Sequence, residues 1–197
     1  SSLPIRNIKE FIAYARAHPG ELNMAASGDG STDHIAGVWL MSATNTKLSF
    51  IPYKNSNAAY PDLLAGRVHM VSIVYSLEGG YPTLVKSGKL RNIGTASLQR
   101  SPMAPDVPTL HEQGVADYEI PSFLGFLAPP KTPAAIVNKL YGEVVKASKL
   151  PEVRQKLGEG AIIVASTPAE FRQMLQGYTE RFRKLTQEYK IEMKPDD

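Results

Sequence analysis

Apolar and polar positions change periodicity repeatedly along the N-terminal half of the chain, as expected for alternating strands and helices. Short apolar runs typical of strands occur at 22–26, 48–53, 68–75 and 90–97. Helical spacing predicts a first helix after Asn7, which forms a possible capping box with Glu10, a second helix near Ser31, and short helices at 58–66 and 81–88. Because strands joined by helices pair mainly in parallel, the pattern predicts an α/β fold with a mainly parallel sheet flanked by helices.

The region after residue 100 has fewer strand-like runs. Prolines between 101 and 108 interrupt regular structure, and a small helix is expected to end within 111–115. The apolar runs at 123–130 and 161–165 predict two further strands.

Helical periodicity dominates the C-terminal third. Helices are expected at 132–148, at 151–160 and from Thr167 onwards. A Thr-Pro pair opens the first and the last of these, so Thr132 is expected to cap its helix with Pro133 at the first helical position. The expected buried stripe of the last helix consists of Phe171, Leu175, Tyr178, Phe182 and Leu185.

The glycine-rich stretch between the run at 22–26 and the second helix is the main candidate for a binding site. Gly28 and Gly30 remove side-chain bulk, and hydroxyl groups are present on Ser27, Ser31 and Thr32. Free amides at a helix N-terminus together with these hydroxyls could hold a carboxylate or phosphate without a cationic side chain. The alternative is structural: the glycines make a tight turn, and Ser31 only caps its helix.

Composition and charge narrow the function classes. The 22 basic and 19 acidic residues are spread along the chain and give a net charge of +3, which suits anionic small ligands better than nucleic acid. The absence of cysteine excludes disulfides, thiolate nucleophiles and cysteine-bound zinc. No apolar stretch reaches the length of a membrane span, and the opening residues contain no signal-peptide core.

Motifs for other chemistry around the glycine loop are incomplete. No Gly-Lys-Ser/Thr phosphate loop follows, and Asp33 stands where a third dinucleotide-binding glycine would be. Asp29, Asp33 and His34 have no metal-ligand spacing, and Ser27 lies outside a nucleophile elbow that could use His34 or His111. We therefore expect no metal, no cofactor and no enzyme activity.

Side chains at the ends of the next two strands are secondary candidates. Tyr53, Lys54, Ser72 and Tyr75 lie at the ends of strand-like runs, on the side where parallel sheets form ligand crevices. The alternatives are a Lys54 stem packed on apolar surface and aromatic rings in the core.

Seven motifs in a fixed order carry a resemblance that covers nearly the whole chain. They are SGDGSTDHIAG, IPYKNSNAAYPDLLAGRV, SGKLRNIGTAS, RSPMAPDVPTLHEQGV, FLGFLAPPKTPAAIVNKLYGEV, PEVRQKLGEGA and STPAEFRQML. In this order they resemble the substrate-binding receptors of tripartite tricarboxylate transporters, the Bug family. The resemblance implies a type II periplasmic binding protein-like fold, in which two α/β lobes close over a small carboxylate.

The resemblance also implies a function and a location. It implies a periplasmic receptor that captures a small carboxylate and delivers it to the membrane subunits of a tripartite transporter, without enzyme activity or cofactor. The ligand-binding residues expected on this basis and from the loop chemistry are Ser27, Gly28, Gly30, Ser31, Thr32, His34, Ser72 and Tyr75.

The family pattern predicts three parts. Residues 1–8 would be an incoming segment of the first lobe, 9–122 a complete second α/β lobe with the ligand loop, and 123–197 a hinge strand with the C-terminal helices of a partial first lobe. The usual opening half of the first lobe has no counterpart here, which favours a shortened receptor sequence. The C-terminal apolar faces would then need another partner.

Two local departures concern the ligand, and one other class of protein remains an alternative. Asn55 replaces a usual glycine, and Ser72, in a long loop between 69 and 89, stands where an acid is often found, which favours a carboxylate without an amine. A ligand-sensing effector domain of a transcriptional regulator shares the two-lobe architecture and would have a helix-turn-helix upstream. An enzyme would need titratable groups converging around His34.

Overall fold

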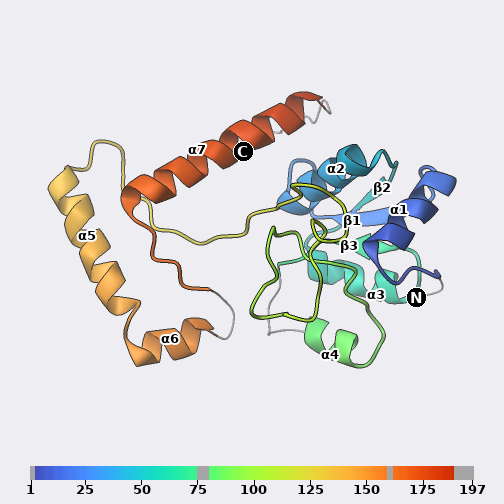
Figure 1. Cartoon of the computed structure of the whole chain (residues 1–197), viewed down its shortest axis with the longest axis horizontal. Helices are drawn as coiled ribbons and strands as arrows, with labels where there is room; N and C mark the ends of the chain where they lie inside the picture. The colour runs from blue at the N-terminus through green and yellow to red at the C-terminus, as the bar shows by residue number, and fades with distance from the viewer. Residues whose placement is uncertain (1–2, 75–79, 159–161, 189–197) are drawn as a thin grey trace. The chain divides into compact units, whose positions relative to one another are not determined.

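The computed structural model describes residues 3–74, 80–158 and 162–188 (Figure 1). The chain divides into two compact units. The first contains Ser1–Val74, Thr83–Ser122 and Lys184–Asp197, and the second contains Tyr75–Pro82 and Phe123–Arg183. The three-part division into lobes that the sequence suggested stays a prediction.

A three-stranded parallel sheet forms the centre of the first unit. Its strands are β1 (Asn23–Ala26), β2 (Ser49–Pro52) and β3 (Met70–Val71), in the order β2-β1-β3. Met24 pairs with Phe50 on one side and with Met70 on the other. Because all three strands are parallel, the segments that follow them lie at one edge of the sheet, which confirms the predicted parallel α/β pattern.

Helix α1 (Ile8–Ala17) is fixed by its cap and by an apolar face. The Asn7 side chain accepts a hydrogen bond from the Glu10 amide at 2.9 Å, as the sequence predicted. Ile8, Phe11 and Ala15 are buried. The helix therefore has both a defined start and a face in the core.

Helix α2 (Thr32–Thr44) joins β1 to β2 and packs closely on the sheet. A Cβ atom on Gly37 would lie 2.5 Å from the Phe50 ring and 2.6 Å from the Met24 sulfur, so only glycine permits this approach. On the same helix, Trp39 contacts the Tyr118 ring at 5.3 Å between centroids. The Tyr118 hydroxyl donates to the Ala36 carbonyl at 2.8 Å, and burial raises the pKa of this phenol.

Short elements complete the first unit. A 3-10 turn η1 (Ser56–Ala59) and helix α3 (Tyr60–Leu64) connect β2 to β3, and helix α4 (Tyr81–Lys86) follows. The helices expected at 58–66 and 81–88 are thus confirmed with shorter bounds.

Two predicted elements between residues 89 and 122 are wrong. The run at 90–97 is not a strand, since it makes only an isolated bridge from Thr95 to Thr109. Residues 111–114 form turns, and 111–115 contains no helix end. The prolines of 101–108 cannot donate backbone hydrogen bonds, so no continuous ladder can form there.

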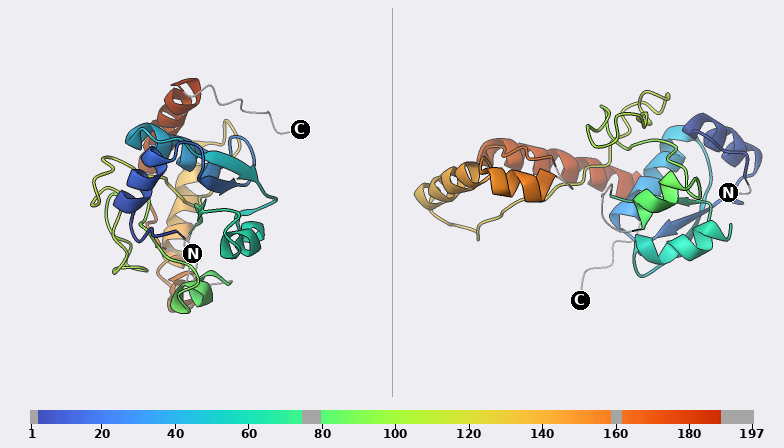
Figure 2. Two further views of the ribbon diagram at one scale, coloured as in Figure 1. Left: turned by 90° about the vertical axis from the view of Figure 1, so that its right-hand side faces the viewer. Right: turned by 90° about the horizontal axis from the view of Figure 1, so that it is seen from below.

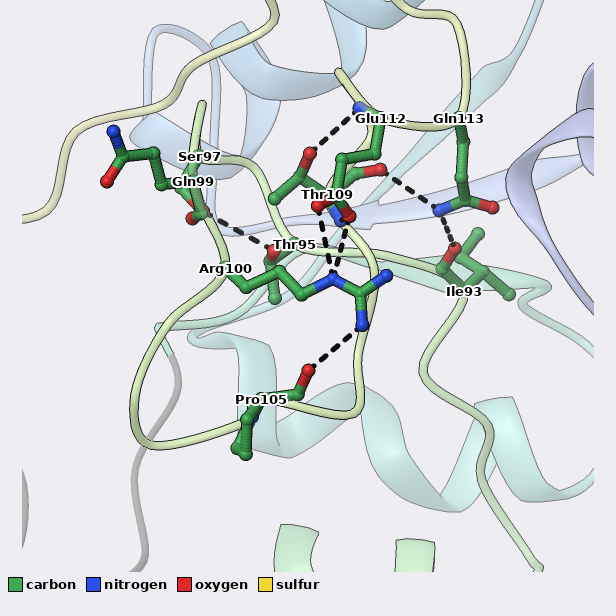
Figure 3. Close-up of polar contacts among 9 residues, drawn as sticks. All are labelled: Ile93, Thr95, Ser97, Gln99, Arg100, Pro105, Thr109, Glu112 and Gln113. Carbon is green, nitrogen blue, oxygen red and sulfur yellow. Dashed lines mark hydrogen bonds and ion pairs between the residues drawn. The ribbon is translucent and has the colours of Figure 1, made fainter.

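Side chains take the place of that ladder (Figure 3). The Arg100 guanidinium donates to the Glu112 carboxylate at 2.9 Å and to the Pro105 carbonyl at 3.0 Å. Glu112 also accepts from the Thr109 amide at 3.0 Å, and Gln113 donates to the Ile93 carbonyl at 2.9 Å. The hydrogen bond from the Thr109 amide lowers the pKa of Glu112 most, and the hydrogen bond from the Arg100 guanidinium lowers it further.

The second unit contains α5 (Ala134–Ala147), α6 (Pro151–Gly158) and most of α7 (Pro168–Glu188), joined by segments without regular structure (Figures 1 and 2). The expected cap at Thr132 is wrong. Pro133 occupies the N-cap position without a side-chain cap, and the Thr132 hydroxyl donates to the Pro129 carbonyl at 2.8 Å. At the start of α7, Thr167 and Glu170 do form a reciprocal capping box. Of the stripe expected on α7, Leu185 alone is buried.

The two strands predicted in this unit are also absent. Residues 123–130 and 162–165 have no ladder partner among the described residues, and Ala161 lies outside them. Phe123 instead contacts the rings of Phe171 and Tyr178, with centroids 5.8 and 6.1 Å apart. Strand-like sequence becomes a strand only when another strand pairs with it.

Candidate functional site

The candidate site is the loop between β1 and α2, at the carboxyl edge of the sheet. Gly28 and Gly30 have φ angles of 133° and 77°, which L side chains rarely adopt. Ser31 is the N-cap of α2: its hydroxyl accepts from the His34 amide at 3.4 Å and donates to the Gly28 carbonyl at 2.7 Å. The turn and the cap expected as the structural alternative are therefore both present.

A buried carboxylate organises this loop. Asp33 is 7% exposed, and its Oδ2 atom accepts from the Ser27 amide at 3.0 Å and from the Ser27 hydroxyl at 2.7 Å. Its Oδ1 atom accepts from the Ser31 hydroxyl and, at 3.0 Å, from the His34 amide. The Ser56 hydroxyl reaches Oδ2 from η1 at 3.3 Å.

These donors keep Asp33 ionised. Burial by itself raises the pKa of Asp33, but the hydrogen bonds from Ser27, Ser31 and His34 together lower it below the ordinary value. The helix dipole at the start of α2 favours the same charged form. The loop thus already contains one anion that belongs to the protein.

The internal hydrogen bonds divide the loop amides into two groups. The Ser27 amide is used by Asp33, the Gly30 amide donates to His34 Nδ1 at 3.0 Å, and the Ser31 amide donates to the Gly28 carbonyl at 3.2 Å. Within residues 3–74, 80–158 and 162–188, no protein acceptor binds the other amides of the loop and the first turn. These free amides are those of Gly28, Asp29, Thr32 and Asp33. Among the backbone amides of the loop, this second group is the one available to an external anion.

His34 presents a donor on its other ring nitrogen. Because Nδ1 accepts the Gly30 amide, the neutral ring carries its proton on Nε2. The ring lies edge-on to Phe50, with centroids 4.5 Å apart, which fixes its plane. His34 is therefore both a support of the loop and a possible donor to a ligand.

The structure brings most of the expected residues together. Six of them lie in one loop and the first turn of α2: Ser27, Gly28, Gly30, Ser31, Thr32 and His34. Ser72 directly follows β3, which pairs with β1, so it lies at the same edge of the sheet. Tyr75 lies outside the described residues. The functional part of this set stays a prediction.

Sequence reasoning missed the central role of Asp33 and the contribution of Ser56. In the sequence, Asp33 stands out only as the residue in place of a third dinucleotide-binding glycine, and nothing singles out Ser56. The one local sign of this role was the presence of an acid in the first turn of α2. The donors to Asp33 could not be predicted, because they come from three separate segments. Tyr53 turns towards α3, where its hydroxyl donates to Asp62 at 2.6 Å, and Lys54 is exposed.

The described residues form neither a metal-binding cluster nor a membrane-spanning helix. In that part of the chain, no three or more histidine, aspartate or glutamate side chains are grouped so that they could hold a metal ion. No helix among the same residues has the length and hydropathy needed to cross a membrane.

A glycine loop at the end of a central parallel strand, with free amides at the next helix, is an arrangement found in ligand-binding α/β proteins. Comparison with known protein families gives a more specific assignment than this arrangement does. The model described as "Tripartite tricarboxylate transporter family receptor" matches residues 1–191, so the chain belongs to this receptor family. This confirms the resemblance found in the sequence and disfavours the regulator-domain alternative.

Individual relatives agree with this assignment. The "UPF0065 protein in tcbD-tcbE intergenic region" of Pseudomonas sp. (strain P51) is 34% identical over 188 residues, which are 94% of this chain and 55% of the relative. The structure of R. palustris Rpa4515 with adipate has a TM-score of 0.75 and 28% identity, over 97% of this chain and 63% of that one. The structure of the periplasmic binding protein BugD has a TM-score of 0.73 and 25% sequence identity, and the match covers 98% of this chain and 64% of BugD.

These comparisons confirm the predicted fold class and its partial extent. The chain has the α/β fold of periplasmic binding proteins of the TctC and Bug type, and it covers part of that fold. It spans about half the length of the curated relative named above.

Proposed function

We propose that this chain provides one wall of the binding cleft of a periplasmic receptor, which captures a small carboxylate and delivers it to the membrane subunits of a tripartite transporter. Membership of the receptor family supports the class of function. The similar structure with adipate, a dicarboxylate, supports the class of ligand. The observation that carries the proposal is the group of free amides at the start of α2.

The loop would recognise charge without a cationic side chain. A ligand carboxylate would accept from the amides of Gly28, Asp29 and Thr32, where the helix dipole favours negative charge. The Thr32 hydroxyl, which has no bond to another described residue, would add a donor.

The charge of Asp33 limits how tightly this wall of the cleft can bind an anion. Its negative charge repels a second anion, so the loop alone would bind a carboxylate weakly. Donors from the opposite, first lobe would then be required for tight binding, and they would couple ligand capture to closure of the cleft. The proposed role is binding and transfer, with no covalent chemistry.

A proline substitution at the first helical position tests the amide contacts. Thr32→Pro removes one free amide. We expect the fold to tolerate it, because proline suits the first helical position and the preceding residue, Ser31, already has the extended φ and ψ angles of −63° and 159° that proline requires. Thr32→Val is the matched control, since it removes the hydroxyl but keeps the amide. A hydrogen bond to a charged group contributes about 1.5–3 kcal/mol, so we expect Thr32→Pro to weaken carboxylate binding by about 10- to 100-fold.

The measurement is isothermal titration of adipate and other di- and tricarboxylates, beside a thermal unfolding curve of each variant. The expected order of affinity is wild type, then Thr32→Val, then Thr32→Pro, with little change in thermal stability. Equal affinity of wild type and Thr32→Pro for every ligand that binds would show that the α2 amides are not the site.

A further inference from the structure

The loop between β1 and α2 contains an Asp-Gly pair, Asp29–Gly30, which is the only such pair in the sequence. The side-chain carboxyl of an aspartate can close a five-membered ring with the amide nitrogen of the next residue, and a glycine at that position places no Cβ atom in the way. The Asp29 side chain is exposed, and its carboxylate bonds to no other described residue. It is therefore free to turn towards the Gly30 nitrogen.

A base that could assist this ring closure lies beside the same nitrogen. The Gly30 amide donates to His34 Nδ1 at 3.0 Å, within the range in which a general base removes a proton. As an acceptor in this bond, Nδ1 has its electron pair directed at the amide hydrogen. The imidazole is held edge-on against the Phe50 ring, so the base keeps its position.

The other acid of the loop has the opposite arrangement. Asp33 is 7% exposed, and its two carboxylate oxygens accept hydrogen bonds from Ser27 and Ser31. The residue that follows Asp33 is a histidine with a bulky side chain, and its amide is already bonded to Asp33 Oδ1. We therefore expect ring closure in this loop at Asp29 alone.

We propose that Asp29–Gly30 is a self-modification site, at which Asp29 becomes isoaspartate with His34 as the base and water as the only co-reactant. His34 Nδ1 takes the Gly30 amide proton, the nitrogen attacks Cγ of the protonated Asp29 carboxyl, and the bond from Cγ to its hydroxyl breaks. The hydroxyl leaves as water with the proton from Nδ1, and a cyclic imide remains. A second water opens this imide at the main-chain carbonyl of Asp29. The chain then runs through Cγ, and the former main-chain carbonyl is a free carboxylate.

Isoaspartate would change the backbone that presents the free amides. It adds a methylene group to the main chain between Gly28 and Gly30. The hydrogen bond from the Ser31 amide to the Gly28 carbonyl, now 3.2 Å long, spans this insertion. The amides on its two sides would no longer point to one carboxylate, so we expect the modified loop to bind the ligand less tightly. This consequence rests on the proposed function, whereas the modification does not.

The test follows isoaspartate at residue 29 while the folded 197-residue chain ages in neutral buffer. Fragmentation mass spectrometry locates the isomer, and enzymatic methylation of isoaspartyl carboxylates counts it. The reference is a synthetic peptide of residues 25–36, which has the same Asp-Gly pair and the same histidine without the fold. Because the fold holds the base against the amide, we expect the chain to react at least about tenfold faster than the peptide. An equal or lower rate in the folded chain would overturn the proposal.

His34→Asn separates a base from a support of the loop. The asparagine amide oxygen can accept the Gly30 hydrogen bond, but it does not take up the proton. We expect formation of isoaspartate to fall by about 100-fold, the low end of what a positioned base contributes, without a change in the urea midpoint of the Trp39 transition. A wild-type rate in His34→Asn would remove His34 from the reaction and overturn the proposal.

Asp29→Glu is the matched control for the site. It keeps the charge at an exposed position but cannot form the five-membered imide, so it should give no isomer in the loop. Isomer in the loop of this variant would contradict the assignment to Asp29.

Adipate titration of the purified isoaspartyl form measures the consequence for binding. We expect an affinity at least about tenfold weaker than that of the fresh chain, the effect of losing one hydrogen bond to a charged group. Equal affinity of the two forms would contradict the predicted loss. If the fresh chain binds no carboxylate, the proposed function fails, while the rates of isomer formation still test the modification.

Discussion

A carboxylate inside the ligand loop is the feature on which the local structure depends. Asp33 collects donors from the residue that follows β1, from the N-cap and from η1, and so holds these parts together. The Ser27 hydroxyl proton is directed towards Asp33, and the single Ser31 hydroxyl proton is shared between Asp33 and the Gly28 carbonyl. The side chains of these two serines therefore act first as supports of the loop.

Replacing this charge should change the acid stability of the first unit. The pKa of Asp33 is lower in the folded chain than its ordinary value of 3.8, so the ionised carboxylate stabilises the fold above that pH. This contribution is lost as the pH falls through the lower folded pKa. We expect Asp33→Asn to cost about 1–3 kcal/mol at pH 7 and to flatten the loss of stability below pH 4.

Urea unfolding followed by the fluorescence of Trp39 measures this effect, because Trp39 is the single tryptophan and is buried in the first unit. Asp29→Asn is the matched control, since Asp29 is an exposed acid of the same loop. Parallel acid profiles for wild type and Asp33→Asn would contradict the assigned role of Asp33.

At the scale of elements, the contact between α2 and the sheet depends on one glycine. A methyl group on Gly37 would overlap Phe50 and Met24, and overpacking of this kind costs about 1–3 kcal/mol. Alanine also improves helix propensity by about 1 kcal/mol, so the net destabilisation should lie at the low end of that range. We predict that Gly37→Ala lowers the urea midpoint of the Trp39 transition.

Gly142→Ala is the control for propensity, because a Cβ atom on Gly142 in α5 would meet nothing within 4 Å. It should leave the Trp39 transition unchanged. An unchanged or higher midpoint for Gly37→Ala would mean that α2 and the sheet separate more easily than their contacts indicate.

Elements were predictable from the sequence where their causes are local. Asn7, Ser31 and Thr167 mark helix starts because a cap involves only the next three residues. The strands at 90–97 and 123–130 were predicted wrongly because apolar sequence does not specify a pairing partner. The functional loop could be located from its glycines, but the convergence of Ser27, Ser31 and Ser56 on Asp33 depends on the folded chain.

For the whole molecule, the two units differ in what they can do alone. The first has a sheet, a core and a defined loop with free amides. The second has exposed strand-like segments and no core. This contrast predicts that weak carboxylate recognition belongs to the first unit and that tight binding requires a completed first lobe.

The central claim is that a carboxylate binds the free amides at the start of α2. Its most direct measurement is a ¹H–¹⁵N correlation spectrum of the chain during titration with adipate. We predict that the amide signals of Gly28, Asp29, Thr32 and Asp33 move in a saturable way, with smaller changes at Ser27 and Gly30. Saturable changes elsewhere without a response of these four amides, or no response at any concentration, would contradict it.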